Sequence, residues 1–404
     1  MKTVILTQYF PPEMGAAQNR IYSLARAFLR QGHDITVLTA LPNYPTGEIF
    51  DDYKGLYKCR ENIDGIEIIR SWLYIHESRN AASLALSYLT FALTAFNVGS
   101  REIDKADLLL WEYPPPFLGY TARKLAKKWN AKLATNIADL WTDALEEQKV
   151  LSAKFILDRI SAFENKIMQD STAITGQTEG VLADIKKRFP RLDPILWPNG
   201  ADPDLFSPEE PSFKPQKRYR TEGKFVVGYS GLHGRNHNLR LVLDAAKLLQ
   251  SKKDIVFMLC GDGFEKKSLI EYAKQNGLDN VQFHDPIPHA ELPELLSLFG
   301  IGIVIHRNLP GLKVVRSAKL FELMSMEIPI LHCAESEGAE IIRRANAGLV
   351  VSEEDPQKIA DSILEMRNSQ KLAEWGKNGR RHVIDHFDRD KISDDLVKKL
   401  EKTV

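Results

Sequence analysis

Short apolar runs alternate with longer amphipathic stretches along most of the 404-residue chain. Near the amino terminus, an apolar run at 3–10 precedes a helical pattern at 16–31, and another apolar run follows at 33–40. The same order recurs between residues 106 and 141, with a helix expected at 120–129. Such short apolar runs are typical of strands buried on both faces. The pattern therefore predicts parallel sheets covered by helices on both sides.

The alternation breaks once, at 195–213, where "ILWPNGADPDLFSPEEPSF" brings together four prolines, a glycine and clustered acids. It restarts with "FVVGYSG" and continues towards the carboxyl terminus. We interpret the break as a linker between two domains, 1–207 and 208–387, and the chain length also favours two. The predicted fold class is α/β, with two Rossmann-like, doubly wound parallel sheets facing a cleft. Such sheets bind ligands beyond the carboxyl ends of their strands.

Composition narrows the class of protein. Apolar residues make up 44% and charged residues 27% of the chain, as in folded globular proteins. The 54 Lys+Arg balance the 54 Asp+Glu, which argues against a nucleic-acid partner. Cys59, Cys260 and Cys333 lack metal-type spacing, so we expect reduced thiols, no metal and a cytoplasmic location. The start, "MKTVILTQYFPP", is interpreted as a first strand rather than a signal peptide.

The segment at 80–100, "NAASLALSYLTFALTAFNVGS", is long enough to suggest a membrane span. Its many Ser, Thr, Asn and Ala residues are unusual for a spanning helix. We expect a long amphipathic or buried helix. A helix lying on a bilayer surface, flanked by Arg79 and Arg101, is the alternative.

Two strand-to-helix turns carry residues suited to phosphate. Gly15 opens the first helix, whose free N–H groups and positive dipole end suit a phosphate or a sugar hydroxyl. In the second domain, Gly231 and Gly234 allow close approach of a ligand to the backbone, and Arg235 offers a planar cation to a diphosphate. An arginine in a first helical turn opposes the helix dipole and needs a nearby anion. Purely structural turns are the alternative.

The stretch "RSAKLFELMSMEIPIL" at 316–331 predicts a short helix that leads into a buried strand. Ser317 is the expected N-cap, and Lys319 and Glu322 share one helical face. The lysine can neutralise a diphosphate, and the carboxylate can accept hydrogen bonds from a ribose diol. An exposed ion pair of little value is the alternative. A later helix start offers further N–H groups to an anion, at Glu337, Gly338 and Ala339.

Other polar residues remain ambiguous. Glu112 and Asp139 end strands of the first domain, so either is a candidate for orienting an acceptor, or a turn acid. We interpret His233 and His237 as loop histidines rather than catalysts. "CGDG" at 260–263 is interpreted as a turn, because it departs from the dinucleotide fingerprint.

Nine motifs follow one another along the chain: "YFPPEMGAAQNRIYSLARAFLRQGHDITVLT", "NYPTGEIFDDYKG", "DLW", "WPNGADPDLFSP", "SGLHGRNHNL", "CGDG", "VQFHDPIPHAELPELL", "SAKLFELMSMEIPIL" and "GRRHVIDHF". In this order they resemble family 4 glycosyltransferases of the GT-B fold, and the resemblance covers nearly the whole chain. It is closest to the bacterial polysaccharide group of L-fucosamine transferase-like enzymes. Each motif alone is weak, but all nine in register are specific.

The resemblance implies retaining transfer from an NDP-sugar, without a bound metal or other cofactor. Arg235 and Lys319 would bind the diphosphate, and Glu322 would hold the nucleotide ribose. Gly15 would lie near the phosphates and the acceptor. The remaining donor contacts would come from the loop of Asp285, Pro286 and Ile287 at the base, and from Glu337, Gly338 and Ala339 at the sugar or its phosphate.

Three departures from the family pattern matter. Val314 replaces the first glutamate of the E-x7-E pair, so no acid can assist there. Ala318 stands where the subgroup usually has proline or serine, and "GRNHNL" lacks a second lysine, which leaves Lys319 as the expected substitute. In the front-side mechanism that the resemblance implies, a phosphate oxygen takes the acceptor proton. The protein then mainly positions the reactants and neutralises charge.

We therefore expect transfer of an N-acetylated hexosamine from a UDP-sugar to a glycan or a polyprenyl-diphosphate-linked sugar. The setting would be cell-surface polysaccharide synthesis, such as O-antigen or capsule, with peripheral contact at the inner membrane face. The family also implies that residues from about 388 to 404 cross back to the first domain. Two alternatives stay open: an NDP-sugar 2-epimerase, for which no clear His/Glu set is seen, and a non-catalytic sugar-nucleotide-binding protein, favoured somewhat by Val314.

Overall fold

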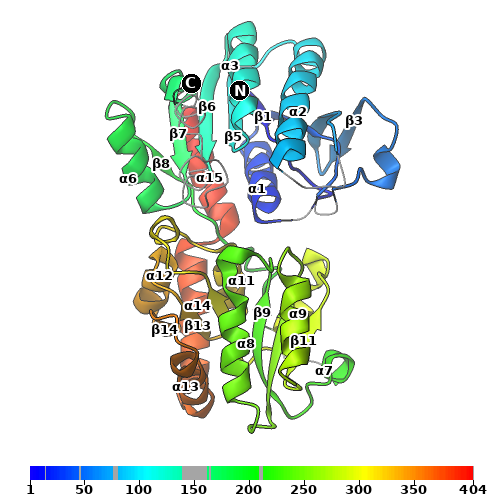
Figure 1. Cartoon of the computed structure of the whole chain (residues 1–404). Helices are drawn as coiled ribbons and strands as arrows, with labels where there is room; N and C mark the ends of the chain where they lie inside the picture. The colour runs from blue at the N-terminus through cyan, green and yellow to red at the C-terminus, as the bar shows by residue number, and fades with distance from the viewer. Residues whose placement is uncertain are drawn as a thin grey trace. The chain divides into compact units, whose positions relative to one another are not determined.

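Figure 1 shows the structure of the chain, a computed structural model. It describes residues 1–13, 15–44, 47–75, 81–138, 162, 165–208 and 213–403. The chain divides into two compact units, which we call the first unit (Met1–Pro198 with Arg389–Val404) and the second unit (Asn199–Asp388). Each contains a parallel sheet between helices, so the predicted α/β class with two doubly wound sheets is confirmed.

The sheet of the first unit has the strand order β3-β4-β2-β1-β5-β6-β7-β8. Only the β3–β4 pair is antiparallel among its described pairs. Its strands are β1 (Lys2–Leu6), β2 (Asp34–Ala40), β3 (Lys58–Ile63), β4 (Ile66–Ser71), β5 (Leu108–Tyr113), β6 (Lys132–Ile137), β7 (Ala173–Gly176) and β8 (Ile195–Leu196).

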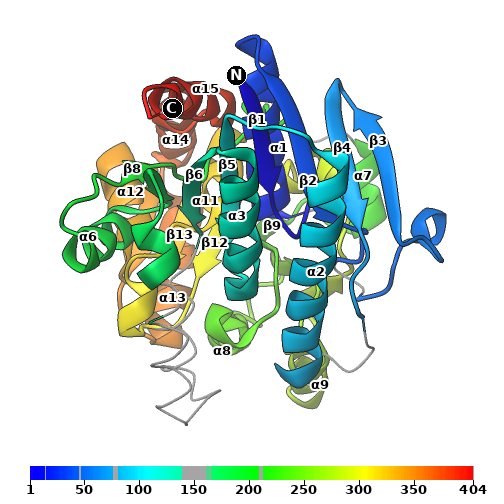
Figure 2. The ribbon, with the colours of Figure 1, turned by 90° about the horizontal axis from the view of Figure 1, so that it is seen from above.

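Helices cover both faces of this sheet. They are α1 (Ala16–Arg30), α2 (Ala81–Glu102), α3 (Pro116–Trp129), α6 (Glu179–Arg188) and α15 (Arg389–Glu401), with a 3-10 turn η1 (Asp51–Tyr53). α1 and α15 share one apolar core with Val37 and Leu110. α2 and α3 lie side by side (Figure 2) and approach Leu38 and Trp111, whose side chains point to the opposite face. The carboxyl-terminal helix thus completes the first unit.

The sheet of the second unit is entirely parallel, in the order β11-β10-β9-β12-β13-β14. Its strands are β9 (Phe225–Ser230), β10 (Ile255–Cys260), β11 (Val281–His284), β12 (Ile301–Ile305), β13 (Ile330–Cys333) and β14 (Gly348–Val351). The core on one face includes α8, α9 and α13, and the core on the other includes α10, α11, α12 and α14. Figure 1 shows α8 and α9 in front of this sheet.

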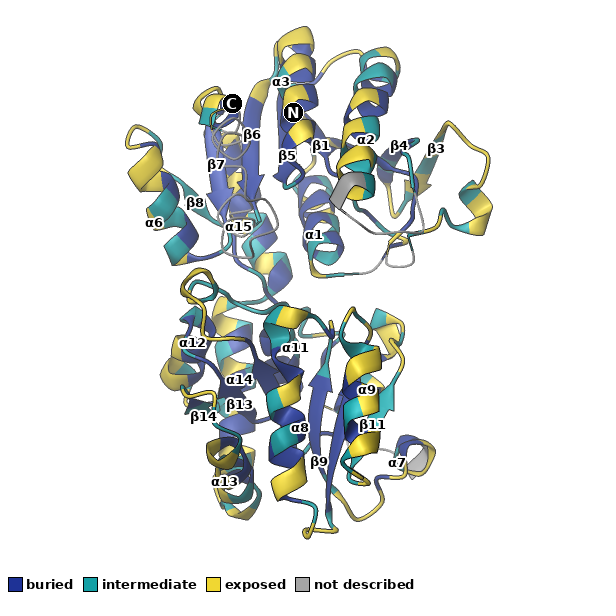
Figure 3. Cartoon of the chain, in the orientation of Figure 1, coloured by how far each residue is buried: buried dark blue, intermediate teal, exposed yellow. Residues whose placement is uncertain are grey.

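The helices of the second unit are α7 (Phe213–Tyr219), α8 (Leu239–Leu248), α9 (Lys266–Gln275), α10 (Leu292–Leu296), α11 (Ala318–Ser325), α12 (Glu337–Ala345), α13 (Pro356–Asn368) and α14 (Leu372–His386). Three 3-10 turns accompany them: η2 (Arg235–His237), η3 (His289–Glu291) and η4 (Pro310–Leu312). Figure 3 shows that the central strands are buried while the outer helix faces are exposed. Cys260 and Cys333 are buried free thiols, as expected, and Cys59 is half-buried.

The boundary between the units falls earlier than the expected 207/208. Residues after Pro198 pack on the second unit, where Phe206 belongs to an apolar core. The carbonyl of Phe206 accepts hydrogen bonds from the Ser325 hydroxyl (2.7 Å) and the Arg380 guanidinium (3.0 Å). The proline-rich segment is therefore partly docked, because its interspersed apolar residues find partners that a linker would lack.

One helix prediction changes, and another is confirmed. α3 begins at Pro116 instead of residue 120, because proline suits the first helical turn, where its missing N–H is not needed. α2 is the amphipathic helix expected at 80–100: Phe91 and Ala95 are buried, while Leu89 and Leu93 are 42% and 60% exposed. None of the helices within the described ranges is long and apolar enough to cross a membrane.

Candidate functional site

The ammonium group of Lys319 lies in a small aromatic and glycine-lined niche of the second unit. Its Nζ is 3.8 Å from the centroid of the Tyr229 ring. A Cβ added at Gly231 would come within 2.7 Å of the same Nζ. Gly231 has φ 138°, a conformation that also favours glycine. The turn after β9 therefore needs glycine there to accommodate the side chain of Lys319, in the first turn of α11.

The buried Nζ of Lys319 has no hydrogen-bond partner among the described residues. Burial lowers the pKa of Lys319 from 10.5 to about 7, and the Glu322 carboxylate opposes that shift. A cation that loses water without gaining an anion is destabilised, so an incoming anion would restore the charged form. Burial also lowers the pKa of His233 to about 4 and of His237 to about 3, so both are neutral at pH 7.

Arg235 stands in the 3-10 turn η2, not at the start of an α-helix. Asn238, with φ 46°, separates this turn from α8, so the expected conflict with the helix dipole does not arise. The exposed guanidinium lies 4.8 Å from the ring centroid of Phe264. No carboxylate of the described residues forms an ion pair with it. Gly234 adopts an ordinary extended conformation (φ −106°), which does not itself require glycine.

The "CGDG" turn explains how this edge is built. A Cβ at Gly261 would lie 1.8 Å from the carbonyl oxygen of Gly231, and one at Gly263 would lie 2.6 Å from that of His233. The two loops also exchange backbone hydrogen bonds, from the His233 N–H to Asp262 O (2.8 Å) and from the Glu265 N–H to His233 O (2.9 Å). These glycines serve backbone-to-backbone packing, which agrees with the interpretation of the motif as a turn.

The helix α11 has the expected buried face, formed by Leu320, Phe321 and neighbouring residues. Ser317 occupies the N-cap position, but its side chain makes no capping hydrogen bond. The Glu322 carboxylate lies 3.1 Å from Nε2 of His289. The alternative interpretation, an exposed ion pair of Lys319 with Glu322, is therefore not seen, and the ribose role of Glu322 stays a prediction.

The loop after β11 also makes contacts within the unit. Asp285 Oδ1 lies 2.6 Å from Nζ of Lys266, and the Asp285 carbonyl accepts a contact from Cys260 Sγ at 3.2 Å. The Lys266 ammonium lowers the pKa of the Asp285 carboxyl. Pro286 and Ile287 continue this exposed loop beyond the strand end. A role for the three residues in base binding remains a prediction.

The N–H groups at the start of α12 were expected to face an anion, but they are already hydrogen-bonded within the unit. Those of Glu337 and Gly338 donate to the carbonyls of Lys313 (2.8 Å) and Val315 (3.2 Å), and that of Ala339 donates to Ser336 Oγ (3.4 Å). The Glu337 carboxylate also pairs with Arg316 at 2.7 Å. The sequence showed the helix start but not the preceding loop, whose carbonyls fold onto it.

Glu112 is buried and makes contacts within the first unit. It is 5% exposed, and Oε1 lies 2.7 Å from the Arg20 guanidinium while Oε2 accepts from Asn136 Nδ2 at 2.7 Å. Burial raises its pKa, and Arg20 and Asn136 oppose the rise. A residue near a strand end can still point into the core, and a role of Glu112 in orienting an acceptor stays a prediction. Asp139, the other acceptor candidate, lies outside the described residues.

Gly15 is the N-cap residue of α1, as expected. No side chain caps this helix end, and its first turn contains no acid. A Cβ at Gly15 would lie 2.5 Å from Oε1 of Gln18, so glycine leaves room for a side chain that folds back on the turn. The proposed contact of Gly15 with phosphate or acceptor is untested.

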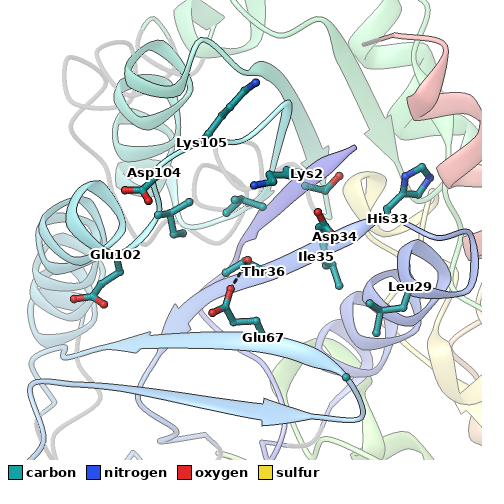
Figure 4. Close-up of a pocket in the computed structure, with 14 residues that line it drawn as sticks. Lys2, Leu29, His33, Asp34, Ile35, Thr36, Glu67, Glu102, Asp104 and Lys105 are labelled. Atoms are coloured by element: carbon teal, nitrogen blue, oxygen red, sulfur yellow. Dashed lines mark hydrogen bonds between the residues drawn. The ribbon is translucent and has the colours of Figure 1, made fainter.

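A cavity of about 430 Å³ opens at the amino ends of strands in the first unit's sheet (Figure 4). Its lining includes Lys2 and Asp34, which begin β1 and β2, and Lys105, which precedes β5. Because open α/β sheets bind ligands at the carboxyl ends of their strands, we assign neither donor nor acceptor to it. Across the described ranges, no group of three or more His, Cys, Asp or Glu is arranged to hold a metal ion.

Comparison with known proteins defines the class. Residues 212–382 match the family "Glycosyl transferases group 1". A relative in Escherichia coli (strain K12), provisionally named as the colanic acid biosynthesis glycosyl transferase WcaI, is 24% identical over 317 residues, covering 76% of this chain and 77% of that protein. The second unit is therefore similar to glycosyltransferase group 1 domains, and the protein is a glycosyltransferase.

Solved structures show the same fold. Sucrose-phosphate synthase from Thermosynechococcus elongatus superposes with a TM-score of 0.76 at 16% identity, covering 100% of this chain and 99% of that one. Anabaena Alr3699/HepE, solved in complex with UDP-glucose, gives a TM-score of 0.73 at 14% identity and covers 100% of both chains. The fold is GT-B, as the sequence resemblance implied.

Proposed function

We propose that the protein is a retaining glycosyltransferase that moves a sugar, an N-acetylated hexosamine, from a UDP-sugar to a glycan or lipid-linked sugar acceptor. The setting proposed is cell-surface polysaccharide synthesis, supported by the colanic acid name of the WcaI relative. The structural neighbour solved with UDP and UDP-glucose supports a nucleotide-sugar donor. The observation that carries the proposal is the buried ammonium of Lys319, which lacks an anion.

The proposed chemistry is a front-side displacement. The acceptor hydroxyl attacks the anomeric carbon from the side of the leaving group, a phosphate oxygen takes its proton, and the nucleoside diphosphate departs. Lys319 and Arg235 neutralise the charge that develops on the diphosphate. This electrostatic stabilisation of the transition state is the main catalytic contribution of the protein. Glu322 would hold the ribose by exchanging its contact with His289 for the diol.

Purified protein tests this directly. It is incubated with UDP-N-acetylglucosamine or UDP-glucose, with and without a lipid-linked glycan extract. Products are separated by chromatography, and NMR and mass spectrometry give their configuration and mass. We expect sugar transfer only when acceptor is present, with the anomeric configuration retained. Conversion of the donor alone into its 2-epimer would support the epimerase alternative. UDP binding by calorimetry without any transfer would support a non-catalytic binder.

We also propose a peripheral contact between α2 and a lipid surface. Leu86, Leu89 and Leu93 recur at helical spacing on the exposed side of α2. On the neighbouring α3, the exposed Lys124 lies over the rings of Phe96 (5.4 Å) and Tyr120 (4.5 Å). Exposed leucines beside lysine suit the interface of an anionic bilayer.

Co-sedimentation with vesicles tests this contact. We expect binding to vesicles containing phosphatidylglycerol and about tenfold weaker binding of Leu89→Glu/Leu93→Glu, since each charge opposes burial of the helix face. Leu248→Glu is the matched control, because Leu248 is an exposed leucine (47%) on α8. Equal sedimentation of the wild type, the double variant and Leu248→Glu would rule out the contact. No sedimentation of the wild type, with or without phosphatidylglycerol, would also rule it out.

A further inference from the structure

The turn that carries Arg235 is tied to a loop from a different strand. Arg307 follows β12 by two residues and makes two hydrogen bonds to this turn. Its backbone N–H donates to the carbonyl of Asn236 (2.9 Å), and its side-chain Nε donates to the carbonyl of Arg235 (2.9 Å). One residue thus fixes two successive peptide groups of η2.

The side chain of Arg235 is held from another direction. Its guanidinium carbon lies 4.8 Å from the ring centroid of Phe264, which is 81% exposed. An aromatic ring with so much exposed surface contributes little to a core, but it offers its face to a cation. Phe264 belongs to the glycine-rich loop at 261–265, which is hydrogen-bonded to the backbone of His233. The ring is therefore anchored beside the turn that it contacts.

The neighbouring residue anchors the β12 loop in turn. The Asn308 N–H donates to the Glu354 carboxylate (2.8 Å), and its Nδ2 donates to the carbonyl of Ser352 (2.6 Å). Its Oδ1 accepts from the Glu335 N–H at 3.1 Å. Arg307 thus belongs to a loop that three further hydrogen bonds hold in place. Because the loop is fixed, the hydrogen bonds from Arg307 also fix the position of η2.

We propose that Arg307 and Phe264 are positioning residues that preorganise Arg235 for the donor diphosphate. This inference rests on the proposed function of Arg235. A free arginine side chain samples many rotamers, and fixing it before binding removes part of the entropic cost of gripping a ligand. Arg307 sets the backbone from which the side chain leaves, and Phe264 supports the guanidinium. Neither residue needs to contact the donor.

A double-mutant cycle by calorimetry tests the proposal, with UDP and uridine as the probes. We expect Arg235→Ala to weaken UDP binding at least about tenfold, and Arg307→Lys or Phe264→Leu to weaken it about three- to tenfold. Adding either change to Arg235→Ala should cause no further loss, because both act through Arg235. Uridine, which lacks phosphates, should bind all variants equally.

The pair Arg240 and Tyr272 provides a matched control. The Arg240 guanidinium carbon lies 3.1 Å from the centroid of the Tyr272 ring, on α8 and α9. Arg240→Lys and Tyr272→Leu remove the same kind of contact between two helices, outside η2, and should leave UDP affinity unchanged. Thermal unfolding of every variant verifies that it is folded.

The outcomes distinguish the diphosphate role of Arg235 from the positioning role of Arg307 and Phe264. If Arg235→Ala binds UDP as the wild type does, the diphosphate role of Arg235 is wrong, and the positioning proposal falls with it. If Arg235→Ala weakens binding but the second change adds its full loss in the double variant, Arg307 or Phe264 acts independently of Arg235. That result, or unchanged affinity in Arg307→Lys and Phe264→Leu, overturns the positioning role alone.

Discussion

The two units each bury a cation, and they treat it in opposite ways. In the first unit, Arg20 is buried against Glu112, which also accepts from Asn136, and Asn136 accepts from Thr175 (2.6 Å). The chain of contacts links α1, β5, β6 and β7. In the second unit, Lys319 is buried over Tyr229 without an anion. A buried charge that is paired with an opposite charge is structural, whereas a buried charge without one indicates a ligand.

The largest expected effect breaks the satisfied pair. Arg20→Met should destabilise the first unit by about 3–5 kcal/mol, because it leaves the Glu112 carboxylate buried without its cation. Chemical denaturation measures the loss. The double variant Arg20→Met/Glu112→Leu should recover most of it, since an apolar pair avoids the cost of desolvating two charges. A double variant no more stable than the single one would show that Glu112 has another role.

The next effect removes the unsatisfied cation. Lys319→Met should weaken UDP binding about 100-fold, because a charge-assisted contact of up to about 3 kcal/mol with the diphosphate is lost. Calorimetry measures the affinity. Turnover should fall with it. Wild-type affinity in a folded Lys319→Met variant would remove the basis of the proposed function.

Lys319→Met should also raise stability. The folded-state pKa of Lys319, about 7, lies below the value of 10.5 for an ordinary lysine, so the unfolded chain binds the proton more tightly. The loss of folding stability caused by burying Lys319 is absent above about pH 10.5, grows as the pH falls towards 7, and is complete below pH 7. The variant should therefore gain most in thermal midpoint at pH 6–7 and least near pH 10. A gain independent of pH would contradict the titration of this group.

A smaller effect accompanies donor binding. At pH 8, UDP should bind with net uptake of up to one proton, because the diphosphate returns Lys319 to its charged form. The groups that act on this ammonium electrostatically include Glu322, which favours the charge, and His233, His237 and His306. Calorimetry in two buffers of different ionisation enthalpy measures the uptake. Lys319→Met should show none, and equal uptake in both proteins would assign the proton elsewhere.

The smallest effect concerns Glu322. Glu322→Gln should weaken UDP and uridine binding equally, by about three- to tenfold, because the carboxylate would serve the ribose and not the phosphates. Calorimetry with both ligands gives the ratio. Glu340→Gln, on the exposed side of α12, is a control that should change neither affinity. Selective loss of UDP affinity would place Glu322 at the diphosphate instead.

The sequence determined the fold class, because the local spacing of apolar residues predicts each buried strand and each amphipathic helix. It also indicated Gly231, Arg235 and Lys319 as candidate donor residues, but not that Lys319 would lie against Gly231. Contacts between distant segments decided the rest. Glu112 turned inward because Arg20 and Asn136 met it from other elements, and the amides of α12 were taken by the loop at 313–315.

Tertiary structure alone decided what surrounds each charge. Nothing in the local pattern near Lys319 indicates that Tyr229 would lie beneath its ammonium, or that Phe264 and Arg307 would reach Arg235. The physical reason is that the environment of a buried charge depends on which loops close over it. Local periodicity decides where a helix or strand forms, but the solvation and partners of its polar side chains come from residues far away along the chain.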